Sequence, residues 1–157
     1  MSLLLFRVDD RLIHGQVVIG WGRPLGVDFI VLIDDAVRES SWEQDLYRMG
    51  VPPEVEVIFA NREEAIRDFA QWSSSPRRGI LLTGSVETIA ALGEAGVPIQ
   101  RVNLGGVHHR PGRSERLPYL YLTDEELQLL ERLEQAGVEV TAQDLPTATP
   151  VTLRALP

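Results

Sequence analysis

Near its start the chain reads Leu3-Leu-Leu-Phe-Arg-Val-Asp-Asp-Arg-Leu-Ile-His-Gly-Gln-Val17, and this stretch sets the pattern of the whole fold. The apolar run Leu3–Val8 predicts a buried first strand. Carboxylates, guanidiniums and one imidazole follow it directly. A helix is predicted from Gly15 to about Gly22, and Pro24 should end it, because proline disfavours helical geometry in the residue before it. The stretch therefore predicts a strand, a charged turn that carries His14, and a helix.

The same alternation of strands and helices continues along the chain. The near-continuous apolar run Phe29–Ile33 is typical of a strand that is buried on both faces. Further strands are predicted over 55–59, 80–82, 101–104, 117–122 and 138–141, and further helices over 41–49, 61–72, 85–96 and 123–137. The pattern predicts an α/β fold, with a single open, mostly parallel twisted sheet of about seven strands and helices on both faces. We expect one domain over residues 1–157, with 146–157 as a surface tail.

The composition excludes several classes of function. A net charge of −8 disfavours binding to nucleic acid. The chain has no cysteine, which removes disulfides, thiolate nucleophiles and cysteine metal sites. All 15 basic residues are arginine, so a Schiff-base lysine and a Walker-type phosphate loop are also excluded. No apolar run approaches the roughly 20 residues of a bilayer span, and the N-terminus lacks a signal-peptide pattern, so we expect a cytoplasmic location.

An imidazole on a strand-to-helix turn has three plausible roles: metal ligand, general base or phosphate acceptor. No metal-binding spacing such as HxH or HExxH surrounds His14, so we expect neither a metal nor a cofactor. Phosphate acceptance suits the neighbouring residues best, with Arg11 neutralising the phosphoryl oxygens. Asp9 or Asp10 could hold the other ring nitrogen or only cap the turn, and we favour Asp10 for the orienting role. The backbone N–H groups of Gly15, Gln16 and Val17 would face the same oxygens. A surface histidine among solvated charges remains the alternative.

Other candidates lie at the predicted carboxyl ends of strands, where ligands bind in sheets of this kind. Arg7 is a second candidate for neutralising phosphate, or else a surface residue at the end of its strand. Thr83 and Ser85 could donate hydrogen bonds to a phosphate, although Ser85 also suits the role of a helix N-cap. His108 is a candidate contact for a partner or for the phosphate, and an exposed loop histidine is its plainer reading.

The segment from Arg7 to Val17 closely resembles the active-site segment of the IIB subunits of the mannose/fructose/sorbose family of the bacterial sugar phosphotransferase system. The resemblance continues through Trp21, Pro52-Pro53, Gly96-Val-Pro98 and Val102-Asn-Leu-Gly-Gly106, and it covers about the first 140 residues. The chain departs from the family at His109, where the family usually has an apolar or aromatic residue. The loop Arg110–Arg116 also carries arginine where the family often carries lysine.

The resemblance implies a mechanism and a set of partners. A phosphohistidine on a IIA protein would pass its phosphoryl group to His14. The chain would then phosphorylate a sugar as the membrane subunits IIC and IID carry it inward, and so associate with the inner face of the membrane. A regulatory phosphotransfer protein without transport and a non-covalent binding module for a phosphorylated ligand remain the alternatives. The sugar and any homo-oligomer stay open.

Overall fold

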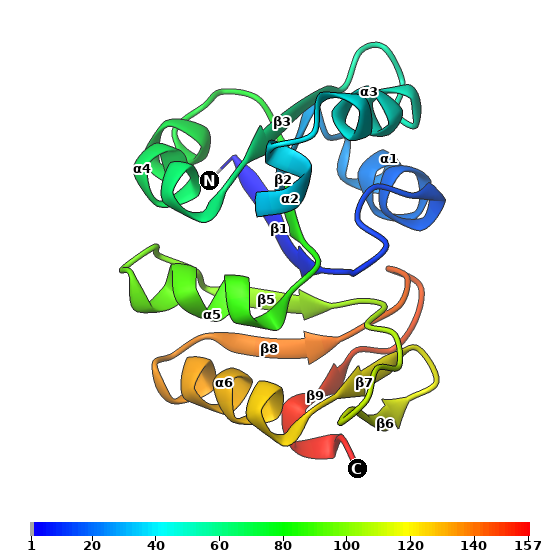
Figure 1. Ribbon diagram of the computed structural model, residues 1–157, viewed down its shortest axis with the longest axis vertical. Coiled ribbons are helices and arrows are strands. Elements are labelled where there is room, and N and C mark those ends of the chain that lie inside the picture. Colours follow the sequence, from blue (N-terminus) through cyan, green and yellow to red (C-terminus); the bar gives the residue numbers. More distant parts are fainter. Residues whose placement is uncertain (1) are drawn as a thin grey trace.

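The computed structural model describes residues 2–157 and contains one large twisted sheet (Figure 1). Its strands lie in the order β3-β2-β4-β1-β5-β8-β9. Six of them are parallel, and only β9 runs antiparallel to its neighbour. Their bounds are β1 Leu3–Val8, β2 Phe29–Ile33, β3 Glu56–Ala60, β4 Gly79–Thr83, β5 Arg101–Leu104, β8 Glu139–Ala142 and β9 Val151–Thr152. The predicted open, mostly parallel sheet is confirmed.

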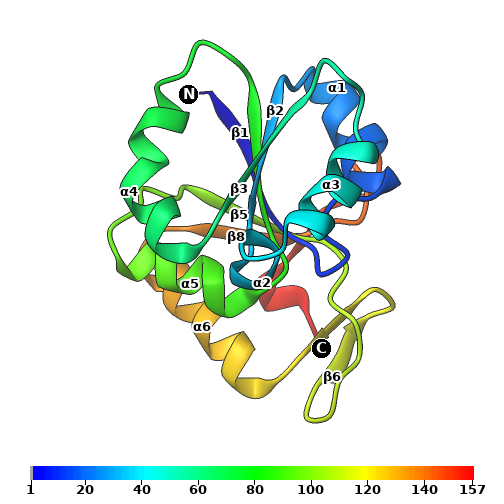
Figure 2. The same cartoon turned by 45° about the horizontal axis from the view of Figure 1, so that its top comes forward.

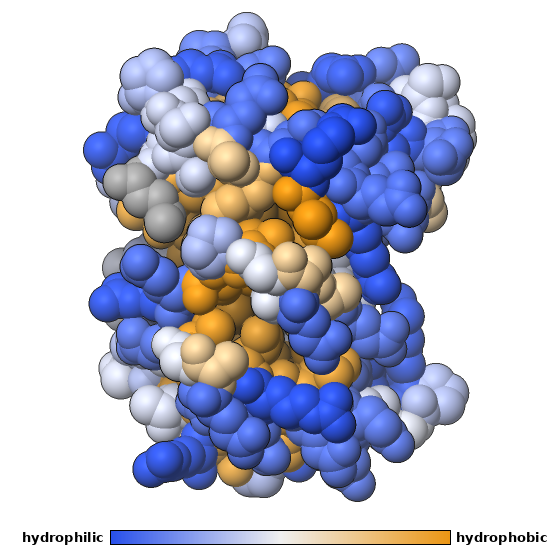
Figure 3. Space-filling view, turned by 90° about the vertical axis from the view of Figure 1, so that its left-hand side faces the viewer, coloured by the Kyte–Doolittle hydropathy of each residue, from blue (hydrophilic) through white to orange (hydrophobic). Residues whose placement is uncertain are grey.

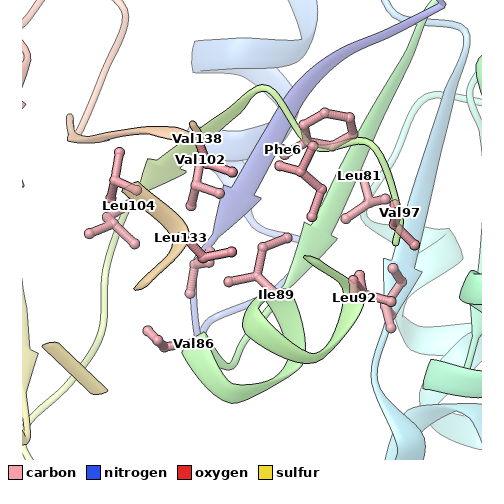
Figure 4. Packing of buried hydrophobic residues seen from close by; sticks show 14 of the residues in the cluster. Phe6, Leu81, Val86, Ile89, Leu92, Val97, Val102, Leu104, Leu133 and Val138 are labelled. Atoms are coloured by element: carbon pink, nitrogen blue, oxygen red, sulfur yellow. The ribbon is translucent and has the colours of Figure 1, made fainter. Parts of the chain in front are cut away.

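Helices cover both faces of this sheet, as their amphipathic sequences predict (Figures 1 and 2). Their side chains join two separate apolar clusters. One cluster lies under α4 (Arg62–Ser73), α5 (Val86–Glu94) and α6 (Asp124–Gln135). The other lies under η1 (Gln16–Gly22), α1 (Arg23–Leu25), α2 (Asp35–Arg38) and α3 (Ser41–Met49). The sheet thus separates two cores, and Figure 4 shows the first of them, between β1, β4 and the buried side of α5.

The helix starts follow the capping signals in the sequence. Capping boxes begin α4 at Asn61 and α6 at Thr123, where the N-cap and the glutamate three residues later bond each other's backbone N–H. Ser85 caps α5, and Ser40 caps α3. Because these hydrogen bonds depend on local sequence, the predicted helix starts lie within a few residues of the observed ones.

The helix after the first strand differs from its prediction. It is a π-helix, η1, and the chain stays helical through α1 instead of stopping before Pro24. Pro24 lies in the first turn of α1, where a missing backbone N–H is tolerated. The helical path ends at Gly26, whose φ of 63° is left-handed. π-Helices are rare and frequently lie at functional sites.

The C-terminal third differs in two places. The predicted strand 117–122 is a separate antiparallel hairpin of β6 (Ser114–Leu117) and β7 (Leu120–Leu122). Pro118 has no N–H to donate to a sheet, and the chain turns there. The predicted surface tail supplies β9, which pairs with β8 at the edge of the large sheet, and the buried Leu153 anchors it. The seventh strand therefore comes from the tail.

Apolar side chains also reach the surface. Figure 3 shows them gathered in a strip across the side of the molecule that lies to the left in Figure 1, between two polar regions. A groove of about 510 Å³ opens where β1 and β5 diverge, lined by Leu5, Gln100 and Asn103 among others. Within residues 2–157, no helix is both long and apolar enough to cross a bilayer.

Candidate functional site

His14 lies on the turn between β1 and η1, at the carboxyl edge of the sheet. The turn is held from both sides, because Asp9 N–H donates to the Thr83 carbonyl at 2.9 Å and Asp10 N–H donates to the Gly106 carbonyl at 2.8 Å. The connection that leaves β1 leads to one face of the sheet, and the chain that leaves β5 leads to α6 on the other. The turn therefore occupies a topological switch point, the place where open α/β sheets bind ligands.

The two ring nitrogens of His14 have different surroundings. Nε2 lies 3.0 Å from Oδ2 of the buried Asp9, an ion-pair distance without the alignment of a good hydrogen bond. Nδ1 accepts a long bond of 3.3 Å from the Gln16 N–H. The Nε2 atom has almost no contact with solvent, while the side chain as a whole is 16% exposed. Solvent therefore reaches the ring away from Nε2.

The carboxylate beside His14 corrects an expectation from the sequence, because it belongs to Asp9 and not to Asp10. Burial by itself would raise the pKa of Asp9, but contacts with His14, Arg7 and Arg11 outweigh it and hold the pKa below its ordinary value. Asp9 Oδ1 also accepts the backbone N–H of Arg11 at 3.2 Å. An ionised Asp9 thus favours a proton on the nitrogen that faces it, Nε2.

Arg7 is a second correction, since its guanidinium is fully buried and has no surface from which to meet a phosphate. It donates to the Asn103 side chain and, at 2.9 and 3.0 Å, to the carbonyls of Gln143 and Asp144. It also lies 3.4 Å from Asp9 Oδ2. Burial lowers the pKa of Arg7, although an arginine stays charged in a protein. Arg7 therefore serves as an internal cation that holds Asp9.

The space around Arg7 is closed on all sides. The guanidinium carbon lies 4.9 Å from the centre of the Trp21 ring, and the Trp21 N–H donates to the Asp144 carbonyl at 3.1 Å. A Cβ at Gly105 would overlap the guanidinium and lie 2.7 Å from Asp9 Oδ2. Glycine at position 105 is thus required by a close approach of side chains to the backbone.

Arg11 is the exposed cation of the site. Its side chain is 38% exposed, and its Nε lies 3.5 Å from Asp9 Oδ1. Its Nη2 donates to Gln16 Oε1 at 2.5 Å, so the first residue of η1 holds the guanidinium. Gly15, between His14 and η1, has no atom within 4 Å of where a Cβ would stand. The backbone next to His14 therefore faces open space at Gly15.

Asp10, which the sequence predicted to contact His14, contacts His108 instead. Its Oδ2 accepts the His108 backbone N–H at 2.7 Å, and its Oδ1 lies 2.5 Å from His108 Nδ1. Arg113 donates to the His108 carbonyl at 2.9 Å and forms a two-bond pair with Glu126 at 3.0 and 2.9 Å. The structure thus brings the loop after β5 onto the active turn, and the sequence had indicated His108 but not Arg113.

The remaining candidates have structural contacts. Ser85 accepts the Thr88 N–H at 3.2 Å as the N-cap of α5. Thr83 is buried and meets the turn through its carbonyl. Gln16 contacts both Arg11 and the imidazole, as its predicted place in the site requires. Within residues 2–157, no group of three or more His, Asp or Glu side chains is arranged to hold a metal ion.

Comparisons with known proteins bear on this arrangement. The chain is 32% identical over 149 residues, 92% of each chain, to the N-acetylgalactosamine-specific phosphotransferase enzyme IIB component 1 of Escherichia coli. It is 28% identical over 147 residues to the mannose-specific EIIAB component of the same organism, covering 94% of this chain and 46% of that relative. The crystal structure of the IIBSor domain of the sorbose permease from Klebsiella pneumoniae superposes with a TM-score of 0.89 at 25% identity, covering 98% and 94%.

A family model extends these likenesses over nearly the whole chain. The model described as PTS system sorbose subfamily IIB component matches residues 3–156. That span includes the turn with His14, the loop with His108 and the tail strand β9. The protein therefore belongs to the sorbose subfamily of IIB components of the PTS, the phosphotransferase system of sugar uptake.

Proposed function

We propose that His14 accepts a phosphoryl group from a phosphohistidine on a IIA partner and passes it to a sugar during uptake through membrane IIC and IID subunits. The observation that carries this proposal is the asymmetry of the imidazole. Nε2 faces the buried carboxylate of Asp9, and Nδ1 accepts the N–H of Gln16, the residue whose side chain holds the exposed Arg11. The charge of Asp9 favours a proton on Nε2 and the Gln16 N–H favours the lone pair on Nδ1, so the surroundings favour the tautomer with a nucleophilic Nδ1.

The acceptor atom is Nδ1. Asp9 holds the proton on Nε2, which leaves the lone pair on Nδ1. In the transfer, Nδ1 attacks phosphorus, the new N–P bond forms, and the N–P bond to the donor histidine breaks with its electron pair returning to that ring. The Gln16 N–H, which lies 3.3 Å from Nδ1, would then donate its hydrogen bond to a phosphoryl oxygen instead. No proton needs to move on His14, so Asp9 acts by orientation and charge.

Arg11 would neutralise the incoming phosphoryl oxygens. Its guanidinium is exposed, and a planar fork of this kind matches two oxygens at once. Gln16 Oε1 holds Arg11 in place before the donor arrives, which reduces the entropy lost on binding. The backbone N–H groups of Gly15 and Val17 remain proposed further donors at the start of η1. Arg7 is not a phosphate contact in this scheme.

The IIA partner is supported by the EIIAB name of the mannose-specific relative, in which this chain matches 46% of the length. Transfer to a sugar at the membrane is supported by the sugar-specific names of the relatives. In this proposal the protein is cytoplasmic and associates with the IIC and IID subunits at the inner face of the membrane. A regulatory role without transport would use the same phosphorylation of His14 and differ only in the acceptor.

The test is phosphorylation from radiolabelled phosphoenolpyruvate with the general phosphotransfer proteins and a IIA protein. We expect one acid-labile phosphate on the wild-type chain and none on His14→Ala. His109→Ala is the matched control, because His109 is an exposed histidine whose contact is the edge of Tyr121, and it should be labelled like the wild type. Label retained by His14→Ala would refute the proposal. No label on the wild type, with a non-covalently held phosphate instead, would favour the binding module.

A further inference from the structure

Asp10 and His108 form a second carboxylate–imidazole pair beside the first. Both oxygens of Asp10 are engaged by His108, one by its backbone N–H and one by its ring Nδ1. A carboxylate only accepts hydrogen bonds, so Nδ1 carries the proton in the neutral ring. Nε2 is then the atom with the lone pair, and the side chain is 65% exposed. The pair presents a basic nitrogen to solvent.

This imidazole is held firmly although it is exposed. Arg113 donates to the His108 carbonyl, and its guanidinium is clamped by two bonds to Glu126. Both side chains of that clamp are largely buried, at 11% and 9% exposed. His108 is therefore held by the turn after β1 and by Arg113 in the loop before β6, which is itself held by α6. A histidine that only faces solvent needs none of these contacts. Such preorganisation is typical of groups that act in catalysis.

The pair lies at the rim of the His14 site. Strands β1 and β5 are neighbours that end in register, with Val8 beside Leu104, and the two loops leave from these ends. Asp9 and Asp10 are consecutive, so one turn holds both imidazoles. A Cβ on Gly106 would lie 3.5 Å from the Nε of Arg11, which brings the loop that carries His108 against the proposed phosphate-binding guanidinium.

We propose that His108 is the general base for the second half-reaction, transfer from His14 to a hydroxyl acceptor. This inference rests on the proposed phosphorylation of His14. The acceptor oxygen attacks phosphorus and a P–O bond forms. The N–P bond breaks, and its electron pair returns to His14 Nδ1. The hydroxyl proton moves to His108 Nε2, and Asp10 stabilises the imidazolium until the proton passes to water.

The first half-reaction has no such need. Phosphoryl transfer between two histidines forms one N–P bond and breaks another, and no hydroxyl proton is released. A base is useful only when the acceptor is an alcohol or water. Loss of His108 should therefore slow the discharge of the phosphoprotein and leave its charging unchanged. A residue that only maintained the shape of the turn would affect both steps.

The experiment measures the two steps separately with His108→Asn in the full chain. The asparagine amide can still donate to Asp10 but has no basic nitrogen, and His109→Asn is the matched control. Charging is followed from a phosphorylated IIA protein. Discharge is followed into N-acetylgalactosamine, fructose, sorbose and mannose with vesicles that carry IIC and IID, and into water in buffer alone.

We expect charging of His108→Asn within about twofold of wild type and discharge slowed by about 10²-fold or more, the range of general-base catalysis. His109→Asn should match the wild type in both steps. Equal discharge of His108→Asn and wild type would overturn the inference, as would an equal slowing of both steps. If none of the four sugars is an acceptor, the hydrolysis rates decide. Failure of the wild type to charge at His14 would instead overturn the proposed function.

Discussion

Replacing Arg7 with methionine tests the internal support of the site. The methionine keeps much of the apolar stem of the side chain and removes a guanidinium that is fully buried. Three acceptors lose their donor, namely the Asn103 side chain and the carbonyls of Gln143 and Asp144. The buried carboxylate of Asp9 loses a cation at 3.4 Å. The change thus leaves a charge and several polar groups unpaired in the interior.

The expected loss in free energy of unfolding is large compared with the total stability of a domain. Removing one partner of a buried ion pair costs about 3–5 kcal/mol, and a domain is stable by only about 5–15 kcal/mol. With a slope of ~2 kcal/mol per molar urea, a loss of ~4 kcal/mol lowers the unfolding midpoint by about 2 M. Arg7→Met should therefore remain folded in buffer but unfold at much lower urea, and His14 should be phosphorylated more slowly because Asp9 is less well held.

The assay is urea unfolding followed by tryptophan fluorescence, since Trp21 stacks on the guanidinium. Arg101→Met is the control, because Arg101 is an exposed strand arginine whose ion pair with Glu139 lies on the surface, where such pairs contribute little. Arg7→Met combined with Asp9→Asn should be less destabilised than the sum of the single changes. A loss below ~1 kcal/mol for Arg7→Met, or strict additivity, would refute the argument.

Two further predictions follow from contacts around the same loops. Gly105→Ala should abolish phosphorylation and lower the melting temperature, because its methyl group would overlap the Arg7 guanidinium, whereas Gly50→Ala, with no atom closer than 3.4 Å to its Cβ, should leave both unchanged. Burial would raise the pKa of Glu126, but its bonds to Arg113 and the helix start lower it below its ordinary value. The ionised Glu126 therefore stabilises the fold at a pH above its pKa in the unfolded chain. This contribution is lost as the pH falls through its pKa in the folded protein. Glu126→Gln should accordingly flatten the loss of urea stability below about pH 4.5, and an unchanged slope would contradict this linkage.

The sequence predicted the site as a place more accurately than as a set of contacts. His14, Arg11 and Gln16 come together as expected, because they lie within one turn of chain. Which of two adjacent carboxylates faces the imidazole depends on how the turn is pinned by Thr83 and Gly106. Neither residue is near the turn in sequence, so spacing alone favoured the wrong aspartate.

Arg7 illustrates a second limit of sequence reasoning. An arginine at the end of a strand usually reaches water. The burial of Arg7 depends on acceptors supplied by residues about 100 to 140 positions away. A glycine at position 105 and an aromatic ring from η1 complete that enclosure. Only the order of the strands in the sheet brings these residues to one place.

The sequence by itself determined the alternating elements, their caps, the two-sided core and the segment that carries His14, because these depend on hydrophobic period and on hydrogen bonds within a few residues. It also removed cysteine and lysine chemistry. The tertiary structure alone decided that Asp9 holds His14, that Arg7 lies inside, that Asp10 pairs with His108 and that the tail completes the sheet. These contacts join residues distant in sequence, and their partners exist only once the strands have assembled.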